Sequence, residues 1–536
     1  MVQSYKKKHT LADKYDAIII GSGMGSLATA ACLSKEGKKV LVLERHYTAG
    51  GYTHVFKRRG YEWDVGIHYI GEMGRDKGVL KQLFDYVTDG ELKWADMGPV
   101  YDRIVIGPNT YDFPKGVTNF ANQMKAYFPD EAEAIDKYID LVFQVSKASR
   151  DFYAEKAMPP LMQKLVGGKM RKGYSSFASR STLEVLQELT SNKELIKVLT
   201  GQYGDYGLPP SKSSFAMHVS VVKHYFNGGY FPIGGSARIV ETVDPVIEAA
   251  GGTILTNAEV TEILVEGNKA KGVKLADGKT YFAEIIISGA GIVNTYDKFL
   301  PNQVSEKYQL DEKLKKLSPS VAHVCLYIGL NGTPDELQLP KANYWIYPED
   351  VDHDEATERY AKDIEQPMPV VYISFPSAKD PSWSERYPGK STIDIIAPMP
   401  YELFKEWSGT KWKKRGDDYE QFKEKLAQRL LAELYKLEPQ VKGKIDCYEL
   451  SSPITTQHFM NYDLGELYGI DHNPERYGHR FLQPRTPIKN LYLTGQDIVT
   501  CGVGGALLAG YLTASTILKK NVIKDVMKSQ SIGQPV

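Results

Sequence analysis

Two short apolar runs near the start of the chain enclose a segment with the composition of a helix. Residues 16–20 read Asp-Ala-Ile-Ile-Ile and residues 39–43 read Lys-Val-Leu-Val-Leu, which is typical of strands buried on both faces. Between them lie a glycine-rich turn at 21–26 and a helix-forming segment at 27–36, which Gly37 ends. This order predicts the first βαβ unit of a Rossmann-like α/β domain.

The glycine-rich turn has the residue spacing of a dinucleotide-binding site. Gly21 permits a tight turn, and Gly23 lets the backbone approach a pyrophosphate at the N-terminus of the following helix. Glu44 comes 23 residues after Gly21, where an acidic residue accepts ribose hydroxyls, so NAD or FAD is favoured over NADP. Ser26 stands where the motif usually ends in glycine and is small enough for the same packing.

The pattern then alternates between helical and strand-like segments. Residues 120–150 and 239–250 have a helical period, and helix starts are predicted at Ser181, Ser191 and the pair Asp417-Asp418. Strand candidates lie at 92–113, 321–330, 370–375 and 392–397, and Asp277-Gly278 predicts a hairpin turn. The acidic segment 349–365 predicts a solvated loop, and the end of the chain from 519 predicts a frayed tail.

One segment supports two interpretations. Residues 151–180 combine phenylalanine, tyrosine, leucine and methionine with six lysines and arginines. Such a surface suits peripheral contact with an anionic membrane, because apolar side chains enter the interface while cations meet the lipid headgroups. The same composition also suits an ordinary solvated helix pair that covers the core, and the sequence leaves both interpretations open.

Composition excludes several functional classes. Lys and Arg number 66 against 66 Asp and Glu, so no long-range field favours nucleic acid, and no nucleic-acid-reading motif is present. The four cysteines are dispersed and the histidines lack metal-ligand spacing, so we expect no metal and a reducing compartment. No run reaches the roughly 18 apolar residues of a membrane span, and residues 1–14 are polar. We expect a cytoplasmic protein, at most peripheral on the inner membrane face.

Three distant motifs together resemble the FAD-binding signature of the amine-oxidase and carotenoid-desaturase flavoprotein superfamily. They are the glycine-rich turn with Glu44, the stretch WDVGIHYIG at 63–71, and the pair NLYLTGQD at 490–497 and GVGGALLAG at 502–510. The runs GQYGDYGLPPSKSSFAMH at 201–218 and GGYFPIGGS at 228–236 narrow the resemblance to the retinol saturase branch of the carotenoid desaturase/isomerase family. Ser22, Met24 and Ser26 depart from that family's glycine motif, and we expect no targeting segment of the kind that its eukaryotic members have.

The resemblance implies a bound FAD and a discontinuous architecture. We expect an FAD-binding domain at 15–115, 231–300 and 481–520, an α+β substrate domain at 116–230 and 301–480, an arm at 1–14 and a tail at 521–536. The expected cofactor contacts are Gly21, Ser22, Gly23, Met24, Gly25, Ser26, Glu44, Arg45, Gly50, Gly51, Tyr52, Gly66, Ile67, His68, Val260, Gly495, Asp497, Gly504, Gly505 and Ala506. Among them, Asp497 can accept ribityl hydroxyls, and the helix from Gly504 is expected to point at the flavin.

The resemblance also implies an apolar polyene as substrate and an electron donor or acceptor that the sequence does not identify. Saturation of a carbon–carbon double bond needs a hydride from the flavin and a proton from a nearby side chain. The candidates for the proton donor are His68, Tyr69, Glu72, Tyr203, Asp205, Tyr206 and His218, with His68 first because histidine titrates near neutral pH. A structural His68 that only contacts the cofactor is the alternative.

Three functions remain open at this stage. The first is an FAD-dependent oxidoreductase that saturates a retinoid- or carotenoid-like polyene. The second is a desaturase or a redox-neutral cis–trans isomerase on the same substrate class. The third is a cofactor-free escort protein for lipidated partners, which the presence of Glu44, Gly495 and Asp497 disfavours.

Overall fold

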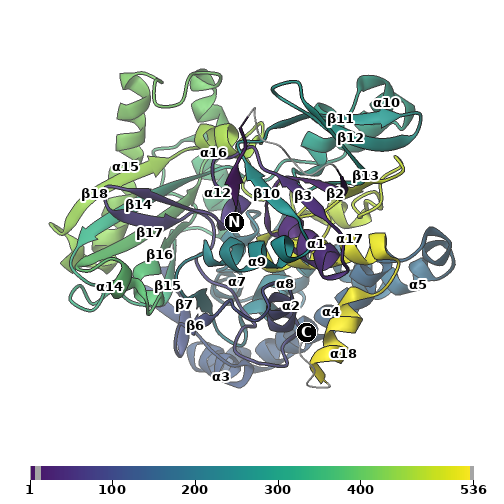
Figure 1. Cartoon of the computed structure of the whole chain (residues 1–536). Helices are drawn as coiled ribbons and strands as arrows, with labels where there is room; N and C mark the ends of the chain where they lie inside the picture. The colour runs from purple at the N-terminus through teal and green to yellow at the C-terminus, as the bar shows by residue number, and fades with distance from the viewer. Residues whose placement is uncertain (1, 7–13, 532–536) are drawn as a thin grey trace.

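A computed structural model describes residues 2–6 and 14–531 of the 536-residue chain. Its eight-stranded sheet has the order β1-β10-β3-β2-β13-β12-β11, whose strands from β10 to β11 are labelled in Figure 1. Strand β19 also pairs with β13. The strands are β1 (Gln3–Ser4), β2 (Tyr15–Ile20), β3 (Val40–Leu43), β10 (Thr253–Thr256), β11 (Val260–Glu266), β12 (Lys269–Leu275), β13 (Thr280–Ser288) and β19 (Leu491–Leu493). The pairs from β1 to β13 and the pair β13–β19 are parallel, whereas β11, β12 and β13 form antiparallel pairs.

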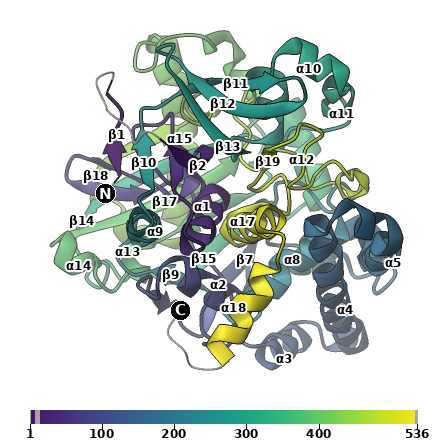
Figure 2. The ribbon, with the colours of Figure 1, turned by 45° about the vertical axis from the view of Figure 1, so that its right-hand side comes forward.

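The first and last parts of the chain meet in this sheet. Helix α1 (Met24–Lys35) follows β2, and α17 (Gly502–Leu518) follows β19, and Figure 2 shows the two helices side by side. A Cβ atom on Gly510 of α17 would lie 2.6 Å from Ala28 Cβ of α1, so glycine is required at this contact. The Thr29 hydroxyl lies 3.2 Å from that of Thr494 and 2.7 Å from Gly25 O.

A second sheet of seven strands lies on the other side of the molecule, in the order β18-β14-β17-β16-β15-β7-β8. Its strands are β7 (Val100–Ile106), β8 (Asn109–Pro114), β14 (His323–Asn331), β15 (Asn343–Tyr347), β16 (Val371–Ser374), β17 (Lys390–Pro398) and β18 (Ile445–Ser451). Helix α15 (Asp417–Leu437) covers one face, where its buried Leu426, Leu430 and Leu434 share a core with the sheet. The opposite face is directed to the interior of the molecule.

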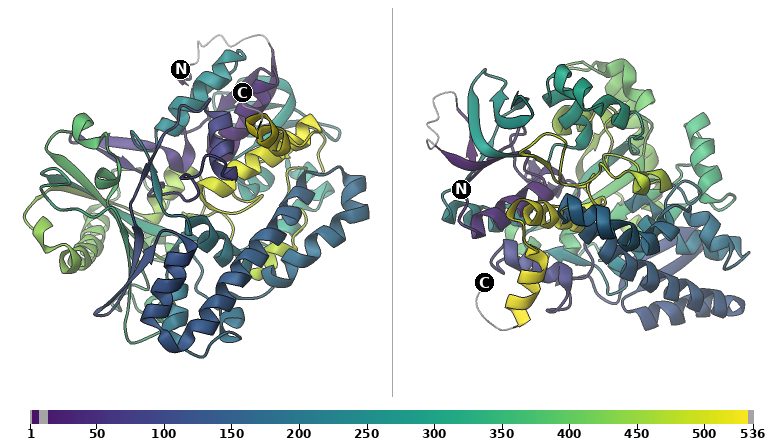
Figure 3. Two further views of the ribbon diagram at one scale, coloured as in Figure 1. Left: turned by 90° about the horizontal axis from the view of Figure 1, so that it is seen from below. Right: turned by 90° about the vertical axis from the view of Figure 1, so that its right-hand side faces the viewer.

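Helices between residues 117 and 225 form a third part, opposite α15 (Figure 3). They are α3 (Val117–Tyr127), α4 (Ala132–Ala157), α5 (Pro160–Ala178), α6 (Thr182–Gln187), α7 (Lys193–Leu199) and α8 (Phe215–Tyr225). Helices α4, α5 and α8 pack on one another through a core that includes Tyr138, Phe152 and Tyr174. The space between these helices and the two sheets contains the candidate site.

The remaining elements are short or peripheral. The β4–β5 hairpin (Val55–Arg58, Tyr61–Asp64) and the β6–β9 pair (Trp94–Asp96, Tyr230–Pro232) form small sheets. The other α-helices are α2 (Val79–Val87), α9 (Arg238–Ala249), α10 (Asn302–Lys307), α11 (Leu310–Leu314), α12 (His353–Lys362), α13 (Pro376–Lys379), α14 (Trp383–Arg386), α16 (Pro453–Met460) and α18 (Val522–Ser531).

The structure confirms the fold class and several local predictions. The turn at Asp277-Gly278 joins β12 to β13, and Ser181 caps α6 with the expected capping box. Helix α15 begins where predicted, although Gly416 rather than an aspartate is its N-cap. Likewise, the cap of α7 is Asn192 and not Ser191, because the Asn192 side chain accepts a hydrogen bond from Leu195 N.

Two predictions of irregular structure are wrong. Residues 353–362, expected in a solvated loop, form α12, which Asp352 caps and which buries Ala356 and Tyr360. The predicted frayed tail contains α18, whose Val522 and Val526 are buried and which packs beside α2 (Figure 2). In the predicted arm 1–14, Gln3–Ser4 pair with β10, whereas residues 7–13 lie outside the described residues, as do 532–536 of the predicted tail.

Candidate functional site

One cavity of about 510 Å³ connects the two sheets and the helical part. Its wall includes the start of α1, the turn after β3, the 63–71 stretch, the 203–207 loop and the start of α17. The predicted cofactor contacts that line it are Gly23, Met24, Gly25, Ser26, Gly50, Gly51, Tyr52, Gly66, Ile67, His68, Gly495, Gly504, Gly505 and Ala506. The structure therefore brings most of the predicted cofactor residues together, although they lie more than four hundred positions apart in the chain.

Two helix N-termini open on this cavity. Gly23 is the N-cap of α1 and Cys501 is the N-cap of α17, and neither provides a side-chain cap hydrogen bond. Neither helix has an acidic residue in its first turn. Unpaired N–H groups and the positive dipole ends of both helices thus face the same space, which suits a ligand with negative charge.

Glycine and serine atoms make room for a ligand at the start of α1. A Cβ atom on Gly25 would lie 2.6 Å from Gly495 N, so the two backbone segments touch directly. Ser26 lines the cavity, and its buried hydroxyl has no hydrogen-bond partner among the described residues. A close backbone cradle without bulky side chains fits the phosphates of a dinucleotide.

Glu44 holds the glycine-rich turn. Its buried carboxylate accepts hydrogen bonds from Ser22 N (2.9 Å), Ser22 Oγ (2.7 Å) and His46 N (2.7 Å). Three of about four acceptor positions are used, so one position remains for a ribose hydroxyl. Neither Glu44 nor Ser22 or Gly21 contributes to the cavity wall.

Three other predicted contacts also lie away from the wall. The Asp497 carboxylate accepts from Ile292 N (2.8 Å) and from Ile470 N (3.4 Å), so the structure directs it at the protein backbone. Arg45 donates to His458 O at 2.9 Å, and Val260 is buried in β11. Their roles in cofactor binding stay predictions.

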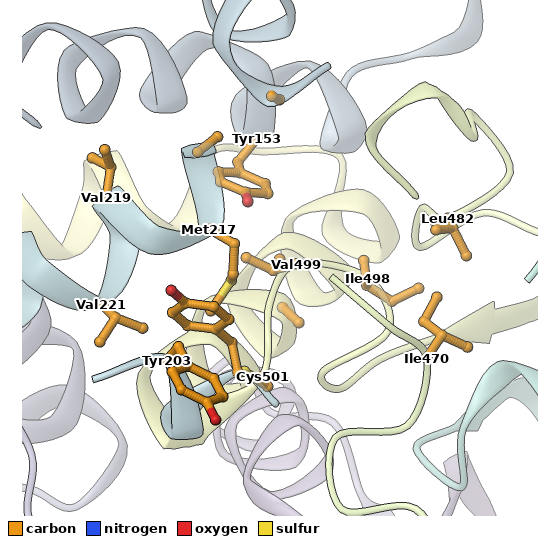
Figure 4. Packing of buried hydrophobic residues seen from close by; sticks show 14 of the residues in the cluster. Tyr153, Tyr203, Met217, Val219, Val221, Ile470, Leu482, Ile498, Val499 and Cys501 are labelled. Atoms are coloured by element: carbon orange, nitrogen blue, oxygen red, sulfur yellow. The ribbon is translucent and has the colours of Figure 1, made fainter. Parts of the chain in front are cut away.

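The remainder of the cavity is largely apolar and aromatic. Tyr153, Tyr203, Met217 and Val219 contribute from the helical part, and Figure 4 shows Met217 and Tyr203 near Cys501. Trp345 and Tyr372 contribute from the seven-stranded sheet, with ring centroids 4.4 Å apart. A long apolar molecule with flat conjugated bonds fits such walls.

A polar network lies in the wall beside these rings. The Tyr69 hydroxyl lies 2.9 Å from Asp102 Oδ2 and 3.2 Å from Asp205 Oδ2. Asp102 also accepts from Asn343 Nδ2 at 2.8 Å and from Gln202 Nε2 at 2.7 Å. Tyr69 and Asp205 line the cavity, so this predicted pair of candidates is brought together.

His68 lies in the same wall but is not an effective acid there. Its Nδ1 is 3.5 Å from Asp394 Oδ2, and both side chains are buried. Burial lowers the pKa of His68 to about 3, so the ring is neutral at neutral pH and has no imidazolium proton to give. This favours the alternative in which His68 is a structural part of the wall.

Of the other candidate donors, Tyr203 and Glu72 line the cavity, whereas Tyr206 and His218 do not. The Tyr203 hydroxyl donates to Pro369 O at 3.5 Å. Glu72 forms an ion pair with Lys223 at 2.8 Å. His218 lies outside the wall, with Tyr138 OH 2.8 Å from its Nε2 and Tyr206 OH 3.3 Å from its Nδ1. Tyr206 and His218 therefore belong to a buried structural network.

Lys379 is a buried cation next to the network, and sequence reasoning missed it. Its Nζ donates to His68 O (2.9 Å), to Ser374 Oγ (2.7 Å) and to Asn343 Oδ1. Burial lowers the pKa of Lys379 to about 7, an effect that the carboxylates of Asp102 and Asp394 partly offset. Asn343 thus links the lysine to Asp102.

Asp102, Trp345 and Tyr372 were missed as well. They lie on β7, β15 and β16. Because successive side chains of a strand point to opposite faces of a sheet, the sequence alone could have assigned the residues of each strand to two faces. Which face meets the cavity depends on the helices that pack on the sheet, and no local signal gives that.

In residues 2–6 and 14–531, no group of three or more His, Cys, Asp or Glu side chains is arranged to hold a metal ion. No helix in that same part of the chain has the length and apolar composition needed to cross a bilayer.

Comparison with known proteins identifies relatives over nearly the whole chain. Residues 27–518 match the family described as flavin containing amine oxidoreductase. An all-trans-retinol 13,14-reductase of Danio rerio is 40% identical over 526 residues, which cover 95% of this chain and 86% of that protein. A chloroplastic prolycopene isomerase of an Oncidium hybrid cultivar is 25% identical over 97% of this chain and 88% of its own length. A putrescine oxidase structure has the same fold, with a TM-score of 0.61, 16% identity and coverage of 95% of this chain and 99% of its own.

The lowered pKa of Lys379 predicts a pH-dependent stability. Because the folded chain holds this proton less tightly than the unfolded chain, the free energy of unfolding should rise from pH 7 to about 9, by at most about 1.4 kcal/mol per pH unit for this group. Lys379→Met should reduce that slope in denaturant titrations. The exposed control Lys405→Met should keep it. Burial also lowers the pKa of Lys156 to about 7, so Lys156 should contribute a slope that remains in both variants. An unchanged slope in Lys379→Met would contradict the assignment.

Proposed function

The chain belongs to the flavin containing amine oxidoreductase family, and on this premise we propose that it is an FAD-dependent oxidoreductase that saturates the 13,14 double bond of all-trans-retinol or a similar polyene. One observation carries the proposal. The glycine-lined cradle at two helix N-termini and the apolar, aromatic walls belong to a single cavity. A dinucleotide in the cradle would therefore adjoin a conjugated substrate.

The residues present fit FAD. Gly23–Ser26 and the N-terminus of α1 would hold its phosphates, Glu44 a ribose hydroxyl, and the N-terminus of α17 the flavin ring. When bound and reduced, FAD supplies a hydride for a carbon–carbon double bond.

The chain's own part of the reaction is to bind the polyene, hold it in place and exclude water. Trp345, Tyr372 and Tyr203 offer ring faces and edges to a conjugated chain. Met217 and Val219 complete an apolar surface from α8. These walls keep the double bond at one place in the cavity, and Tyr69 and Asp205 bring polar atoms to the same wall.

The reaction is tested by the mass of the product. Holoenzyme reduced with dithionite and mixed anaerobically with all-trans-retinol should convert it to a product heavier by two hydrogens. An unchanged mass with altered geometry would instead support an isomerase, as in the prolycopene isomerase relative, and a loss of two hydrogens would support a desaturase. A colourless protein that releases no flavin on denaturation would favour the escort alternative.

Glu44→Ala tests the cofactor site. Loss of the carboxylate removes the ribose acceptor and leaves Ser22 N and His46 N without their partner, so FAD affinity should fall at least about tenfold while the protein stays soluble. FAD bound per protein after dialysis measures this. Glu266→Ala, which removes a side chain that is 74% exposed, should keep full occupancy. Full occupancy in Glu44→Ala would refute the ribose assignment.

A surface of α5 supports peripheral contact with an anionic membrane. We call it the α5 face, and it consists of Leu161, Met162, Lys164, Leu165, Lys169 and Lys172. Leu161 and Leu165 are each 69% exposed and Met162 is 43% exposed, which would be costly in water unless the surface is covered. Helix α5 has no acidic residue, and Tyr174 of the same helix lines the cavity. An apolar substrate could pass from lipid to the cavity beside this face. The cytoplasmic side stays a prediction.

Vesicle flotation tests the α5 face. The protein should float with phosphatidylcholine vesicles that contain phosphatidylserine. The Leu161→Glu/Leu165→Glu variant should lose at least about tenfold in binding, because anions replace the two exposed leucines that would enter the membrane interface. Phe282→Glu changes a 60% exposed apolar residue elsewhere and should bind as the wild type does. Equal binding by the double variant and the wild type would contradict the proposed contact.

A further inference from the structure

Asp102, Tyr69 and Asp205 form a hydrogen-bonded chain that ends at the cavity. Asp102 lies on β7 and is fully buried, Tyr69 lies in the 63–71 stretch, and Asp205 lies in the short helical turn Tyr203–Asp205. The ring of Tyr69 stacks on Tyr225, with centroids 4.1 Å apart and an interplanar angle of 8°. This packing fixes the Tyr69 hydroxyl between the two carboxyl groups.

The number of hydrogen atoms that Asp102, Tyr69 and Asp205 can share decides which of the two carboxyl groups is protonated. A phenol has one hydrogen, yet Tyr69 Oη lies 2.9 Å from Asp102 Oδ2 and 3.2 Å from Asp205 Oδ2. Both contacts are hydrogen bonds only if one carboxyl group also has a hydrogen. Asp102 is the ionised member, because it accepts from Asn343 and Gln202 as well. Among the described residues, the Asp205 carboxyl has no hydrogen-bond partner other than the Tyr69 hydroxyl, whose one hydrogen goes to Asp102. Asp205 is therefore the carboxylic acid.

The electrostatic environment agrees with this assignment. Burial raises the pKa of Asp205 well above its ordinary value, and the charge on Asp102 raises it further. Asp205 and Glu72 are the two carboxyl groups in the described wall of the cavity, and Glu72 is neutralised by Lys223. The hydrogen count and the polar partners of Asp102 therefore make Asp205 the protonated acid in the wall.

We propose that Asp205 is the proton donor in the saturation of the substrate double bond, and that Tyr69 and Asp102 position it. This inference rests on the proposed function. Reduced FAD, when bound, would supply the hydride and its two electrons to one carbon of the double bond. The π electron pair would then form a C–H bond at the neighbouring carbon with the proton of the Asp205 carboxyl, whose O–H bond breaks. A proton from solvent would restore Asp205 after each turnover.

The test compares wild type with Asp205→Asn and the control Asp354→Asn, which alters a partly buried aspartate that contacts Ser211 outside the cavity. Dithionite-reduced holoenzyme is mixed anaerobically with all-trans-retinol, and reoxidation of the flavin is followed. Asp205→Asn should slow it at least about 100-fold. Retinol binding to the oxidised enzyme should stay within about threefold of wild type. Asp354→Asn should reoxidise as the wild type does.

The pH profile separates a proton donor from a structural residue. The wild-type rate should fall as pH rises through the pKa of Asp205, because the carboxylate form has no proton to give. Asp102→Asn removes the negative neighbour and should move this fall to lower pH. Infrared spectra of the wild type labelled with ¹³C-aspartate should show a protonated carboxyl that Asp205→Asn lacks, and this measurement does not depend on turnover.

The outcomes are distinguishable. A wild type that leaves retinol unchanged would overturn the proposed function. An active wild type with Asp205→Asn within about threefold of its rate would overturn the proton donor alone. If Asp205→Asn does not fold, absence of a protonated aspartate band in the wild type, or an unshifted pH profile in Asp102→Asn, would overturn it as well.

Discussion

The direct contact between the backbones of Gly25 and Gly495 is the constraint on which the site depends. Any side chain on Gly25 would overlap Gly495, and any side chain on Gly510 would overlap α1. Because α1 and α17 approach so closely, their N-termini open on one cavity rather than on two. The Thr29 and Thr494 hydroxyls pair across this contact. The fold thereby joins two segments that are distant in sequence into one cradle whose backbone donors suit an anion.

The cavity combines a polar end with an apolar, aromatic wall. Near the glycines the wall offers backbone donors and helix dipoles, whereas the aromatic wall offers apolar surface and little hydration. Low hydration also raises the pKa of Asp205 and lowers the pKa values of His68 and Lys379. The polar network from Lys379 through Asn343 and Asp102 to Tyr69 is satisfied by hydrogen bonds and so holds its geometry.

Sequence reasoning was most effective where the chemistry is local. The turn at Gly21–Ser26 and Glu44 could be read because strand, helix and acid occur within one βαβ unit, whereas the C-terminal half of the cradle required resemblance to a family. Asp102 and Tyr372 could not be predicted, because the side of a strand that meets the cavity is set by helices far away in the chain. Residues 353–362 were misread because the acidic residues of this region suggested a loop. Asp352 instead caps a helix that begins with Asp354 and Glu355 in its first turn and is anchored by buried Tyr360.

The central claim is that both ends of the chain hold one flavin beside an apolar cavity. A crystal structure of the purified yellow protein tests it most directly. We predict one FAD per chain that contacts both Gly23–Ser26 and Gly504–Ala506, with its ring system facing Tyr372. Density that shows no flavin, or a flavin held by only one of these two segments, would contradict the account.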